Sequence, residues 1–271
     1  MTEGGTYPSD MVSMGERRRR ILEMVRGRPF VSVGEVSGMF GVSEVTVRSD
    51  FQALERQGKL RRVRGGVVAS EGGIPRREPS FLESLGTSAK EKEAIGHAAA
   101  ALVVPGETII LDVGTTTSAV ARALAVRDDL EDVVVFTNGI TIALELEPAI
   151  PRIAVVVTGG TLRPLQHSLV DPLAGAMLEQ VHVDTVFLGC NGVDSAAGVT
   201  NINLPEAAIK RRMIAAARRR FVVADGSKIG VVSLAPLCSI DDIDLLITGP
   251  SADAGVLAQL RDLALQIKVV S

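Results

Sequence analysis

The chain has 271 residues, of which 46% are hydrophobic, so it is long for one domain and comfortable for two. No apolar run reaches the roughly 18–20 residues of a membrane span, and the first residues lack the apolar core of a secretion signal, which argues against a membrane protein and a secreted one. The net charge of −3 hides an uneven distribution, because residues 1–79 carry 14 Lys and Arg against 10 Asp and Glu, whereas residues 80–271 carry 15 against 22.

This uneven charge predicts a basic head that binds nucleic acid and an acidic body that does not. Residues 11–68 alone carry 12 Lys and Arg against 6 Asp and Glu, and such a region is attracted to the phosphate backbone of DNA. The two cysteines, Cys190 and Cys238, are far apart and have no metal-ligand partner at useful spacing. A reduced, cytoplasmic protein without a metal site is the simplest interpretation.

Residues 1–12 contain Gly, Ser and Pro without apolar periodicity, so we expect them to be disordered. A helix is predicted over residues 13–26, with a buried stripe of Ile21, Leu22 and Val25. The run Arg17–Arg20 spans a full helical turn and cannot all face one partner. It is either a solvated helix face, or one or two of its members contact phosphate.

Two further helices follow a helix-turn-helix pattern. Ser32 and Glu35 have the spacing of a capping box that opens the second helix, and Gly41 makes the turn into the third. Ser43 is a good N-cap for the third helix because its hydroxyl accepts an otherwise unpaired backbone N–H. This helix is expected to bury a stripe at i, i+4 and i+7, namely Val47, Phe51 and Leu54.

The opposite face of the third helix is short, polar and cationic, which suits the edge of a DNA major groove. The residues of this helix expected to contact DNA are Ser43, Val45, Thr46, Arg48, Ser49, Gln52 and Arg56. After Gly58, which is expected to end the helix, a basic strand turns at Gly65 and can lay its cations along a phosphate backbone. The expected contacts of this wing are Lys59, Arg61, Arg62 and Arg64. Residues 13–68 are therefore predicted to form a winged helix-turn-helix DNA-binding domain.

Residues 69–88 are rich in Pro and Gly with mixed charge, which predicts a linker. Over residues 89–271, helical patterns alternate with apolar, β-branched runs, which indicates an α/β domain with a mostly parallel sheet and helices on both faces. The expected strands are 108–112, 133–136, 153–157, 185–188, 221–224 and 245–248. The expected helices are 90–102, 117–125, 141–147, 173–180, 205–217 and 253–264.

In open α/β sheets, ligands bind beyond the carboxyl ends of the strands, and here those ends share one chemistry. Each loop joins a glycine to small polar groups, and the first, Asp112-Val-Gly-Thr-Thr-Thr117, leads into a helix N-terminus that offers N–H and O–H groups to a phosphate. These loops together favour a pocket for a polyhydroxylated, phosphorylated small molecule. The residues expected to bind this effector are Asp112, Gly114, Thr115, Thr116, Thr117, Asn138, Gly159, Gly160, Asn191, Asp194, Glu206 and Lys228.

Several of these residues have a structural alternative. Gly-Gly and Asn-Gly are also plain turn sequences, Lys228 is either a phosphate ligand or solvated surface, and Glu206 in a first turn also favours the helix N-terminus. The run Arg218–Arg220 is expected to end a helix, where cations are favoured. Cys190 is interpreted as a packed residue rather than a nucleophile, and His167 as a ligand contact at most.

The stretch from Val42 to Val68 resembles the DNA-binding motif of the DeoR family of bacterial transcriptional regulators, and the resemblance continues nearly to the C-terminus. The matching segments, in the family's order, are residues 42–50, Arg64-Gly-Gly, Asp112-Val-Gly-Thr-Thr-Thr, Phe136-Thr-Asn-Gly, Thr158-Gly-Gly, Asn203-Leu-Pro-Glu206 and Ala224-Asp-Gly-Ser-Lys228. The resemblance implies a sugar-responsive regulator, most often a repressor. Its sensor would be similar in fold to ribose-5-phosphate isomerase and glucosamine-6-phosphate deaminase, with the catalysis lost. It also implies a phosphorylated sugar as effector and a homo-oligomeric protein.

Two departures from the family pattern bear on these expectations. Ser49 stands on the groove face where the family commonly has a second arginine, so the operator sequence is not transferable from relatives. Asp171 stands where the family usually has glycine, which is expected to affect the pocket or its effector.

The leading hypothesis is therefore a repressor without cofactor or catalytic activity, whose binding to a double-stranded DNA operator is modulated by a sugar phosphate. The alternative is a sugar-phosphate isomerase or deaminase that carries a DNA-binding head. Proton transfer beside a carbonyl needs a positioned acid and base, and Asp112, Asp194, Glu206 and Lys228 are available in principle. Against this alternative, the loop 190–194 has fewer acidic residues than the related isomerases have there.

Overall fold

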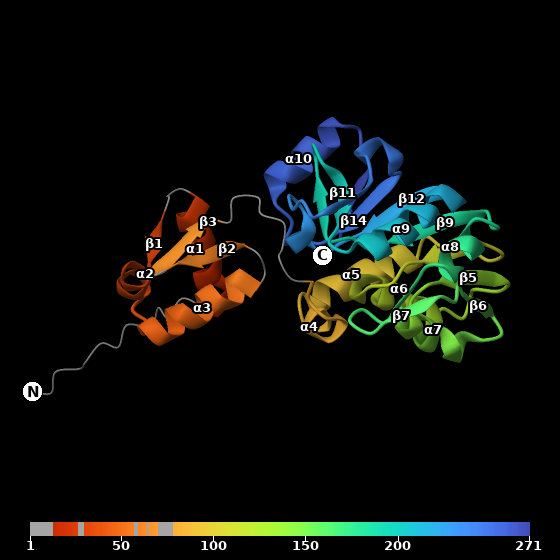
Figure 1. Ribbon diagram of the computed structural model, residues 1–271, viewed down its shortest axis with the longest axis horizontal. Helices are drawn as coiled ribbons and strands as arrows, with labels where there is room; N and C mark the ends of the chain where they lie inside the picture. Colours follow the sequence, from red (N-terminus) through yellow and green to blue (C-terminus); the bar gives the residue numbers. More distant parts are fainter. Residues whose placement is uncertain (1–12, 27–29, 57–58, 64, 70–77) are drawn as a thin grey trace, which may run out of the picture. The chain divides into compact units, whose positions relative to one another are not determined.

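The computed structural model describes residues 13–26, 30–56, 59–63, 65–69 and 78–271. The chain divides into two compact units, Met1–Gly73 and Ile74–Ser271 (Figure 1). The expectation of disorder for residues 1–12 lies outside the described residues, as do Gly58 and Arg64. Among the helices of the described residues, none is both long and apolar enough to cross a membrane.

The first unit has the elements of a winged helix-turn-helix. Its helices are α1 (Met14–Arg26), α2 (Val33–Phe40) and α3 (Glu44–Arg56). The strands β1 (Val31–Ser32), β2 (Leu60–Val63) and β3 (Gly66–Ala69) form an antiparallel sheet in the order β1-β3-β2. The hairpin β2–β3 turns at Gly65, whose φ of +86° is a conformation that glycine adopts without strain.

Local sequence signals account for this unit. The Ser32 and Ser43 hydroxyls accept the backbone N–H groups of Glu35 and Thr46, so both serines act as the predicted N-caps. Gly41 ends α2 in the left-handed region with φ of +63°. The predicted apolar stripe of α3 is confirmed, since its three side chains are at most 2% exposed and pack in one cluster with residues of α1, α2 and the sheet.

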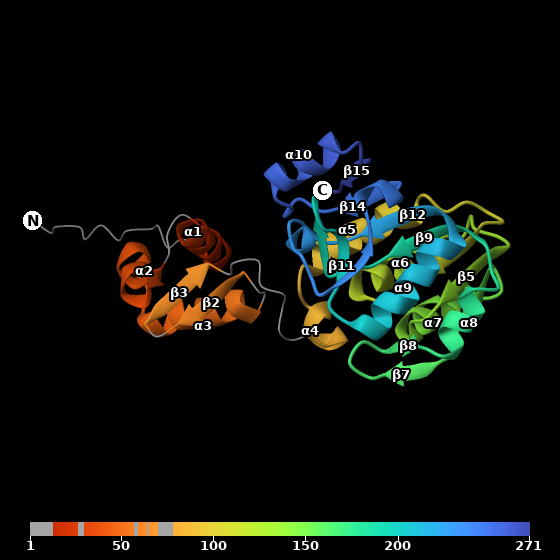
Figure 2. The same ribbon diagram turned by 45° about the horizontal axis from the view of Figure 1, so that its top comes forward.

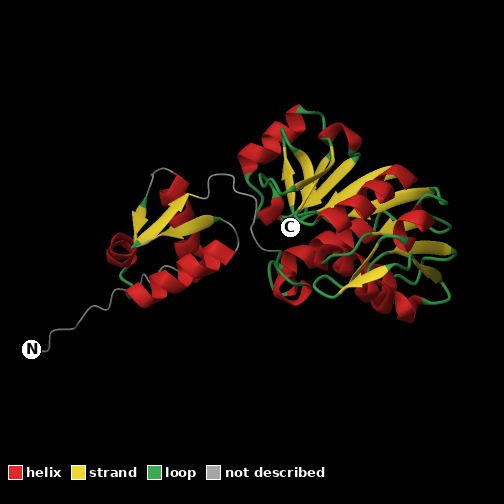
Figure 3. Cartoon of the chain, in the orientation of Figure 1, coloured by secondary structure: helices red, strands yellow, loops and turns green. Residues whose placement is uncertain are grey.

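The second unit is built on one parallel sheet. Within the described residues, seven strands pair in the order β15-β14-β12-β9-β4-β5-β6, and all their pairings are parallel. The strands are β4 (Thr108–Leu111), β5 (Val133–Thr137), β6 (Ile153–Val157), β9 (Val183–Leu188), β12 (Ala217–Val223), β14 (Leu245–Thr248) and β15 (Ile267–Val269). The predicted α/β fold with a mostly parallel sheet is confirmed (Figure 3).

Helices cover both faces of this sheet because successive strand residues point to opposite sides. On one face, an apolar cluster joins Ile109 and Leu111 of β4, with buried residues of the neighbouring strands, to three helices. These are α5 (Ala89–Ala100), α6 (Thr115–Ala125) and α7 (Ile140–Leu146). The other joins Ile110, Val186 and Val222 to α8 (Leu173–Leu178), α9 (Leu204–Ala216) and α10 (Ala254–Asp262). In Figure 2, α9 lies in front of the strands.

Smaller elements lie outside the main sheet. The strands β10 (Gly192–Asp194), β11 (Gly198–Asn201) and β13 (Ala235–Cys238) form an antiparallel sheet, and β7 (Thr161–Arg163) pairs with β8 (Ser168–Val170) as a hairpin. Short 3₁₀ helices are η1 (Glu147–Ala149), η2 (Gly226–Lys228) and η3 (Ile240–Asp242).

Two sequence-based expectations differ from the structure. Arg218–Arg220 do not end a helix, because α9 stops at Ala216 and these residues lie on β12. There, Arg219 pairs with buried Glu107 and stacks on the Phe221 ring. Part of the predicted linker is ordered as well, since residues 81–85 form helix α4 (Phe81–Leu85), which opens with a Ser80–Glu83 capping box.

Candidate functional sites

The outer face of α3 is exposed and polar, as the sequence predicts for a DNA-contacting helix. Val45 is 77% exposed, and Ser49 and Gln52 are exposed beside it, one turn apart. Arg48 is exposed and pairs with Glu44 across one turn, whereas Thr46 is half-buried and its hydroxyl bonds to Ser43. The side chain of Arg56 lies outside the described residues.

The wing adds exposed cations next to this face. Lys59, Arg61 and Arg62 are exposed at the start of the hairpin and on β2. Arg62 also receives support from α3, because its backbone N–H donates to the Glu55 carboxylate at 2.9 Å. The predicted contact Arg64 lies outside the described residues.

The arginine run of α1 has a role that the sequence did not indicate. Asp50 on α3 is 2% exposed and accepts the Nε–H groups of both Arg17 and Arg18 at 2.7 Å. Arg19 and Arg20 pair with Glu16 on the exposed side of the same helix. Half of the run therefore ties α1 to α3, so of the two alternatives the solvated face is wrong for Arg17 and Arg18.

In the second unit, the strand order reverses between β4 and β9, and the crevice beyond the carboxyl ends of such strands is the usual ligand position in this class of sheet. A cavity lies there, and several chain segments far apart in the sequence contribute to its wall. The lining residues are Glu78, Pro79, Ser84, Lys92, Val113, Gly114, Thr115, Thr116, Thr117, Gln166, Gly189, Cys190, Asn191, Asn201, Glu206, Lys210, Ala224, Asp225 and Lys228.

One side of this cavity is suited to an anion. Gly114 precedes α6 with φ of 151°, and Thr115, Thr116 and Thr117 form its first turn, whose N–H groups point out of the helix end. Lys228 lines the same cavity, and among the described residues no carboxylate oxygen lies within 4.0 Å of its ammonium group. A helix N-terminus and a cation that no described carboxylate pairs with together favour a phosphate.

Lys210, which lines the cavity, forms a buried ion pair with Asp112, which does not. Asp112 is fully buried and also accepts the Gly189 N–H at 3.0 Å, while Lys210 donates to the Gly189 carbonyl at 3.0 Å. Burial raises the pKa of Asp112 to about 6, although the Lys210 ammonium acts in the opposite direction. Asp112 therefore positions Lys210 rather than facing the cavity itself.

Among the described residues, two buried carboxylates line the cavity, Glu206 and Asp225; Glu206 lies on α9. It occupies the third position of α9, where its N–H bonds to the Asn203 side chain, as the structural alternative predicted. Its carboxylate also accepts the Ser168 hydroxyl at 2.6 Å and pairs with Arg163. Glu206 therefore belongs both to the first turn of α9 and to the lining of the cavity.

Some predicted effector residues lie away from the cavity. Asn138 is buried, with its side chain bonded to the Val113 N–H and the Leu169 carbonyl, so it shapes the first loop from behind. Gly159 and Gly160 follow the edge strand β6, and Gly160 packs against Val170. Asp194 orders the β10–β11 turn by accepting the N–H groups of Ala196 and Ala197. Strands β5 and β6 lie on the far side of β4 from the reversal, which explains the position of their loops.

Sequence reasoning missed Lys92 and Lys210, although a signal was present. Lys92 stands three residues before Ile95 and seven before Ala99, and Lys210 lies between Glu206 and Met213 at helical spacing, so both fall on the buried stripes of their helices. Burial lowers the pKa of Lys92, whose ammonium donates to the Ser84 carbonyl at 2.7 Å. Glu78, Pro79, Ser84 and Gln166 carry no comparable local signal.

Two other sequence-based expectations concern Cys190 and Asp171. Cys190 lines the cavity, but burial raises its pKa to about 12, so the thiol stays protonated at neutral pH. Asp171 lies outside the cavity lining, contrary to the expected effect on the pocket. It accepts the Gly175 N–H in the first turn of α8 and pairs with Arg212.

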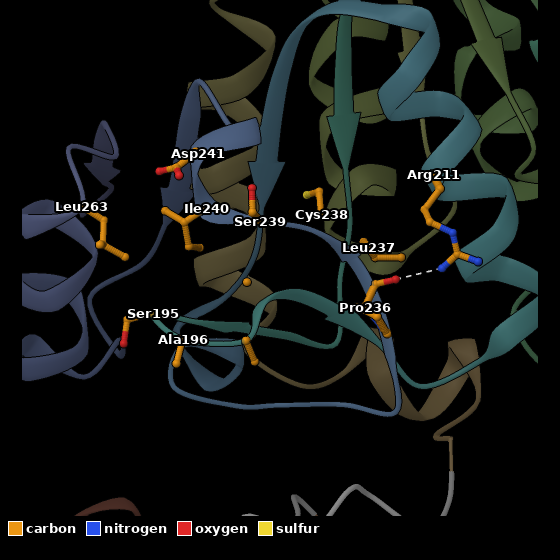
Figure 4. A pocket seen from close by; sticks show the side chains of 12 residues that line it. Ser195, Ala196, Arg211, Pro236, Leu237, Cys238, Ser239, Ile240, Asp241 and Leu263 are labelled. Atoms are coloured by element: carbon orange, nitrogen blue, oxygen red, sulfur yellow. Dashed lines mark hydrogen bonds between the residues drawn. The ribbon is translucent and has the colours of Figure 1, made fainter.

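A larger hollow of about 700 Å³ lies elsewhere on the second unit, near the β10–β11 turn, β13 and η3 (Figure 4). Figure 4 shows Arg211 and Leu263 on opposite sides of it, with Arg211 bonded to the Pro236 carbonyl at 2.8 Å. Its charged side chains, Arg211 and Asp241, are exposed to solvent. The candidate effector site is therefore the cavity beyond β4 and β9, where buried charged groups converge.

Comparisons with known proteins match one family domain to each of the two units of the chain. Residues 17–72 match the DeoR-like helix-turn-helix domain, and residues 87–250 match the DeoR C terminal sensor domain. An HTH-type transcriptional regulator of Bacillus subtilis, YulB, is 36% identical over 257 residues, covering 95% of this chain and 97% of its own. The transcriptional repressor AccR of Agrobacterium fabrum is 32% identical over 237 residues, covering 87% and 90%.

A solved structure of ribose 5-phosphate isomerase A from Methanocaldococcus jannaschii aligns with 52% of this chain and 55% of its own, with 18% identity and a TM-score of 0.39.

Proposed function

This chain belongs to the DeoR family of transcriptional regulators, and from this membership we propose that it represses carbohydrate-metabolism genes under the control of a phosphorylated sugar. The first unit binds a double-stranded operator, and the sugar phosphate occupies the cavity of the second unit. Helix-turn-helix regulators commonly bind two half-sites as dimers, so the working form is a homo-oligomer. A regulator of bacterial genes acts in the cytoplasm, where the DNA is.

DNA binding by the first unit is supported by the division of labour on its surface. The exposed face of α3 carries polar side chains suited to base edges, whereas the wing carries cations suited to phosphates. Specificity and affinity are therefore expected to depend on different residues.

Replacing Gln52 with alanine should relax sequence preference, while replacing Arg61 with alanine should weaken binding to all duplexes and reduce the salt slope by about 1. The measurement is a fluorescence-anisotropy titration of selected and scrambled duplexes at several salt concentrations. Arg218→Ala, a loss of an exposed arginine on the second unit, serves as the matched control and should change neither quantity. Equal effects of Gln52→Ala and Arg61→Ala on specificity would contradict the assignment.

The observation that supports a sugar phosphate is the meeting of the α6 N-terminus and Lys228 with carboxylate and amide side chains in one cavity. The first pair suits the phosphate group. Asn191, Asn201 and Glu206 line the same cavity and provide acceptors and donors for sugar hydroxyls. Free sugars lack the anionic group, and they are expected to bind much more weakly.

A thermal-shift screen of sugar phosphates, free sugars and nucleotides tests this proposal. A ligand that binds only the folded protein stabilises it by about 2.7 kcal/mol at one hundred times its dissociation constant. We expect a shift with a sugar phosphate that Lys228→Met abolishes and that Lys268→Met, an exposed lysine on β15, leaves intact. An equal shift in both variants would place the ligand elsewhere.

We also infer that the chain has no sugar-phosphate isomerase or deaminase activity. Of the acidic residues considered as a general base, Glu206 lines the cavity, but its carboxylate already pairs with Arg163 and accepts the Ser168 hydroxyl, so these contacts hold it as a hydrogen-bond acceptor. A turnover assay with ribose 5-phosphate and glucosamine 6-phosphate decides the point, since steady product formation that is lost in Glu206→Gln would establish the enzyme instead.

A further inference from the structure

One wall of the cavity is formed by the chain segment that follows the connection from the first unit. Residues 78–86, which we call the wall segment, are the first described residues after the connection from β3. Glu78, Pro79 and Ser84 of this segment line the cavity directly. The covalent path from the DNA-binding unit therefore enters the second unit as part of the effector site.

Arg163 on β7 holds the wall segment to the cavity. Its Nη2 donates to the Glu78 carboxylate at 2.8 Å, and its Nη1 donates to the Glu206 carboxylate. The side chains of Glu78, Arg163 and Glu206 are 12%, 18% and 5% exposed, so water screens these contacts little. One guanidinium thus joins the wall segment to a buried carboxylate of the cavity.

Further contacts fix the wall segment on the β7–β8 hairpin. The Gln166 side chain donates to the Pro79 carbonyl at 2.5 Å, and the Phe81 N–H donates to the Leu165 carbonyl at 2.8 Å. The Phe81 ring lies 5.2 Å from the His167 ring between centroids. His167 therefore contacts the wall segment, and it is not among the residues that line the cavity.

The wall segment is the side of the cavity most able to move. The cavity measures about 80 Å³, whereas small-molecule pockets usually measure roughly 300–1,000 Å³, so a sugar phosphate needs a wall to shift. The opposite walls belong to the sheet and to buried turns of α6 and α9. Helix α4 has five residues and buries one side chain, Phe81, which gives it little apolar stabilisation of its own.

We propose that Arg163 is a positioning residue of the effector site, which clamps the wall segment over the cavity through Glu78 and Glu206, and that effector binding releases the segment and so alters the connection to the DNA-binding unit. This inference rests on the proposed function and adds its regulation. Arg163 stays with Glu206 while Glu78 is displaced. Because the effector binds the released form, a variant that raises the fraction of released segment without effector must bind the effector more tightly. The gain in affinity equals the factor by which that fraction rises.

Glu78→Ala in the full-length chain tests the clamp without any ligand. Hydrogen exchange of the Phe81 amide, whose partner is the Leu165 carbonyl, should accelerate at least about tenfold because the segment opens more often. The matched control is Glu179→Ala, which breaks a salt bridge to Arg212 outside the cavity and should leave this exchange unchanged. Gln166→Ala, which removes the Pro79 contact and leaves Arg163 intact, should act in the same direction.

The second readout is affinity for a duplex that the wild-type chain selects from random DNA. Glu78→Ala without ligand should shift this affinity at least about threefold toward the value that wild type shows with its sugar phosphate, and it should bind that sugar phosphate more tightly. Unchanged Phe81 exchange, or faster exchange with wild-type DNA affinity, would overturn the clamp. A wild-type chain that gives no thermal shift with any sugar phosphate would instead refute the proposed function, while the ligand-free comparison would still decide the clamp.

Discussion

Replacing Asp50 with alanine should unfold the first unit and abolish DNA binding while the second unit stays folded. Asp50 is 2% exposed and is the carboxylate that both Arg17 and Arg18 contact at 2.7 Å. Its removal leaves the cation of Arg17, which is itself buried, without this partner. Breaking a buried ion pair from one side typically costs about 3–5 kcal/mol, which is comparable to the whole stability of a domain this small.

Urea unfolding followed by circular dichroism, together with DNA-binding titrations, measures this effect. In wild type we expect an early transition for the first unit and a later one for the second. In Asp50→Ala the early transition should disappear or move to much lower urea, and the later one should not move. Glu16→Ala is the control, because it breaks exposed ion pairs of the same helix with Arg19 and Arg20. If Asp50→Ala unfolds like Glu16→Ala, the arginines of α1 do not hold the unit together.

Replacing Lys210 with methionine should strongly destabilise the second unit. The change leaves Asp112, which is fully buried, without its counter-ion. The expected loss is again about 3–5 kcal/mol at neutral pH, measured by denaturant unfolding. Lys228→Met provides a matched control, since this lysine of the same cavity has no carboxylate within 4.0 Å among the described residues and its removal should change stability little.

This loss should depend on pH through Asp112. Its pKa is raised to about 6 by burial, against the lowering effect of Lys210, so removing Lys210 raises the pKa further. A carboxyl whose pKa is higher in the folded state than its ordinary 3.8 stabilises the fold fully below about pH 4 and loses that contribution as pH rises through the folded pKa. The Lys210→Met loss is therefore expected to be larger at about pH 8 than at about pH 5. A loss independent of pH, or no recovery in Lys210→Met with Asp112→Asn, would contradict the buried pair.

The sequence predicts the first unit well because its signals are local. Ser43 caps α3 by accepting a hydrogen bond from the N–H of Thr46, only three residues later. The spacing of Val47, Phe51 and Leu54 alone identifies the buried face. The contact of Asp50 with Arg17 and Arg18 spans more than thirty residues. A charged residue on a helix gives no indication of such a partner, so this contact could not be predicted.

In the second unit, the strands and the first phosphate-binding loop were predictable, but the grouping of loops was not. Gly114 and Thr116 lie at the reversal of strand order, whereas Gly160 has the same local chemistry and lies beside the edge strand. Only the order of the strands separates them. The segment around Glu78 read as a linker because its Pro-rich composition does not reveal the contact with Arg163, which is 85 residues away.

The most direct test of a sugar-phosphate-controlled regulator is one titration of a labelled duplex, selected by the full-length chain, with and without the sugar phosphate that gives the largest thermal shift. We expect saturating ligand to change the dissociation constant of the duplex about tenfold or more, within the usual range of allosteric coupling, and the Lys228→Met variant to bind the duplex without responding to the ligand. Equal affinity in the presence and absence of the bound ligand, or no duplex binding even at low salt, would contradict the account.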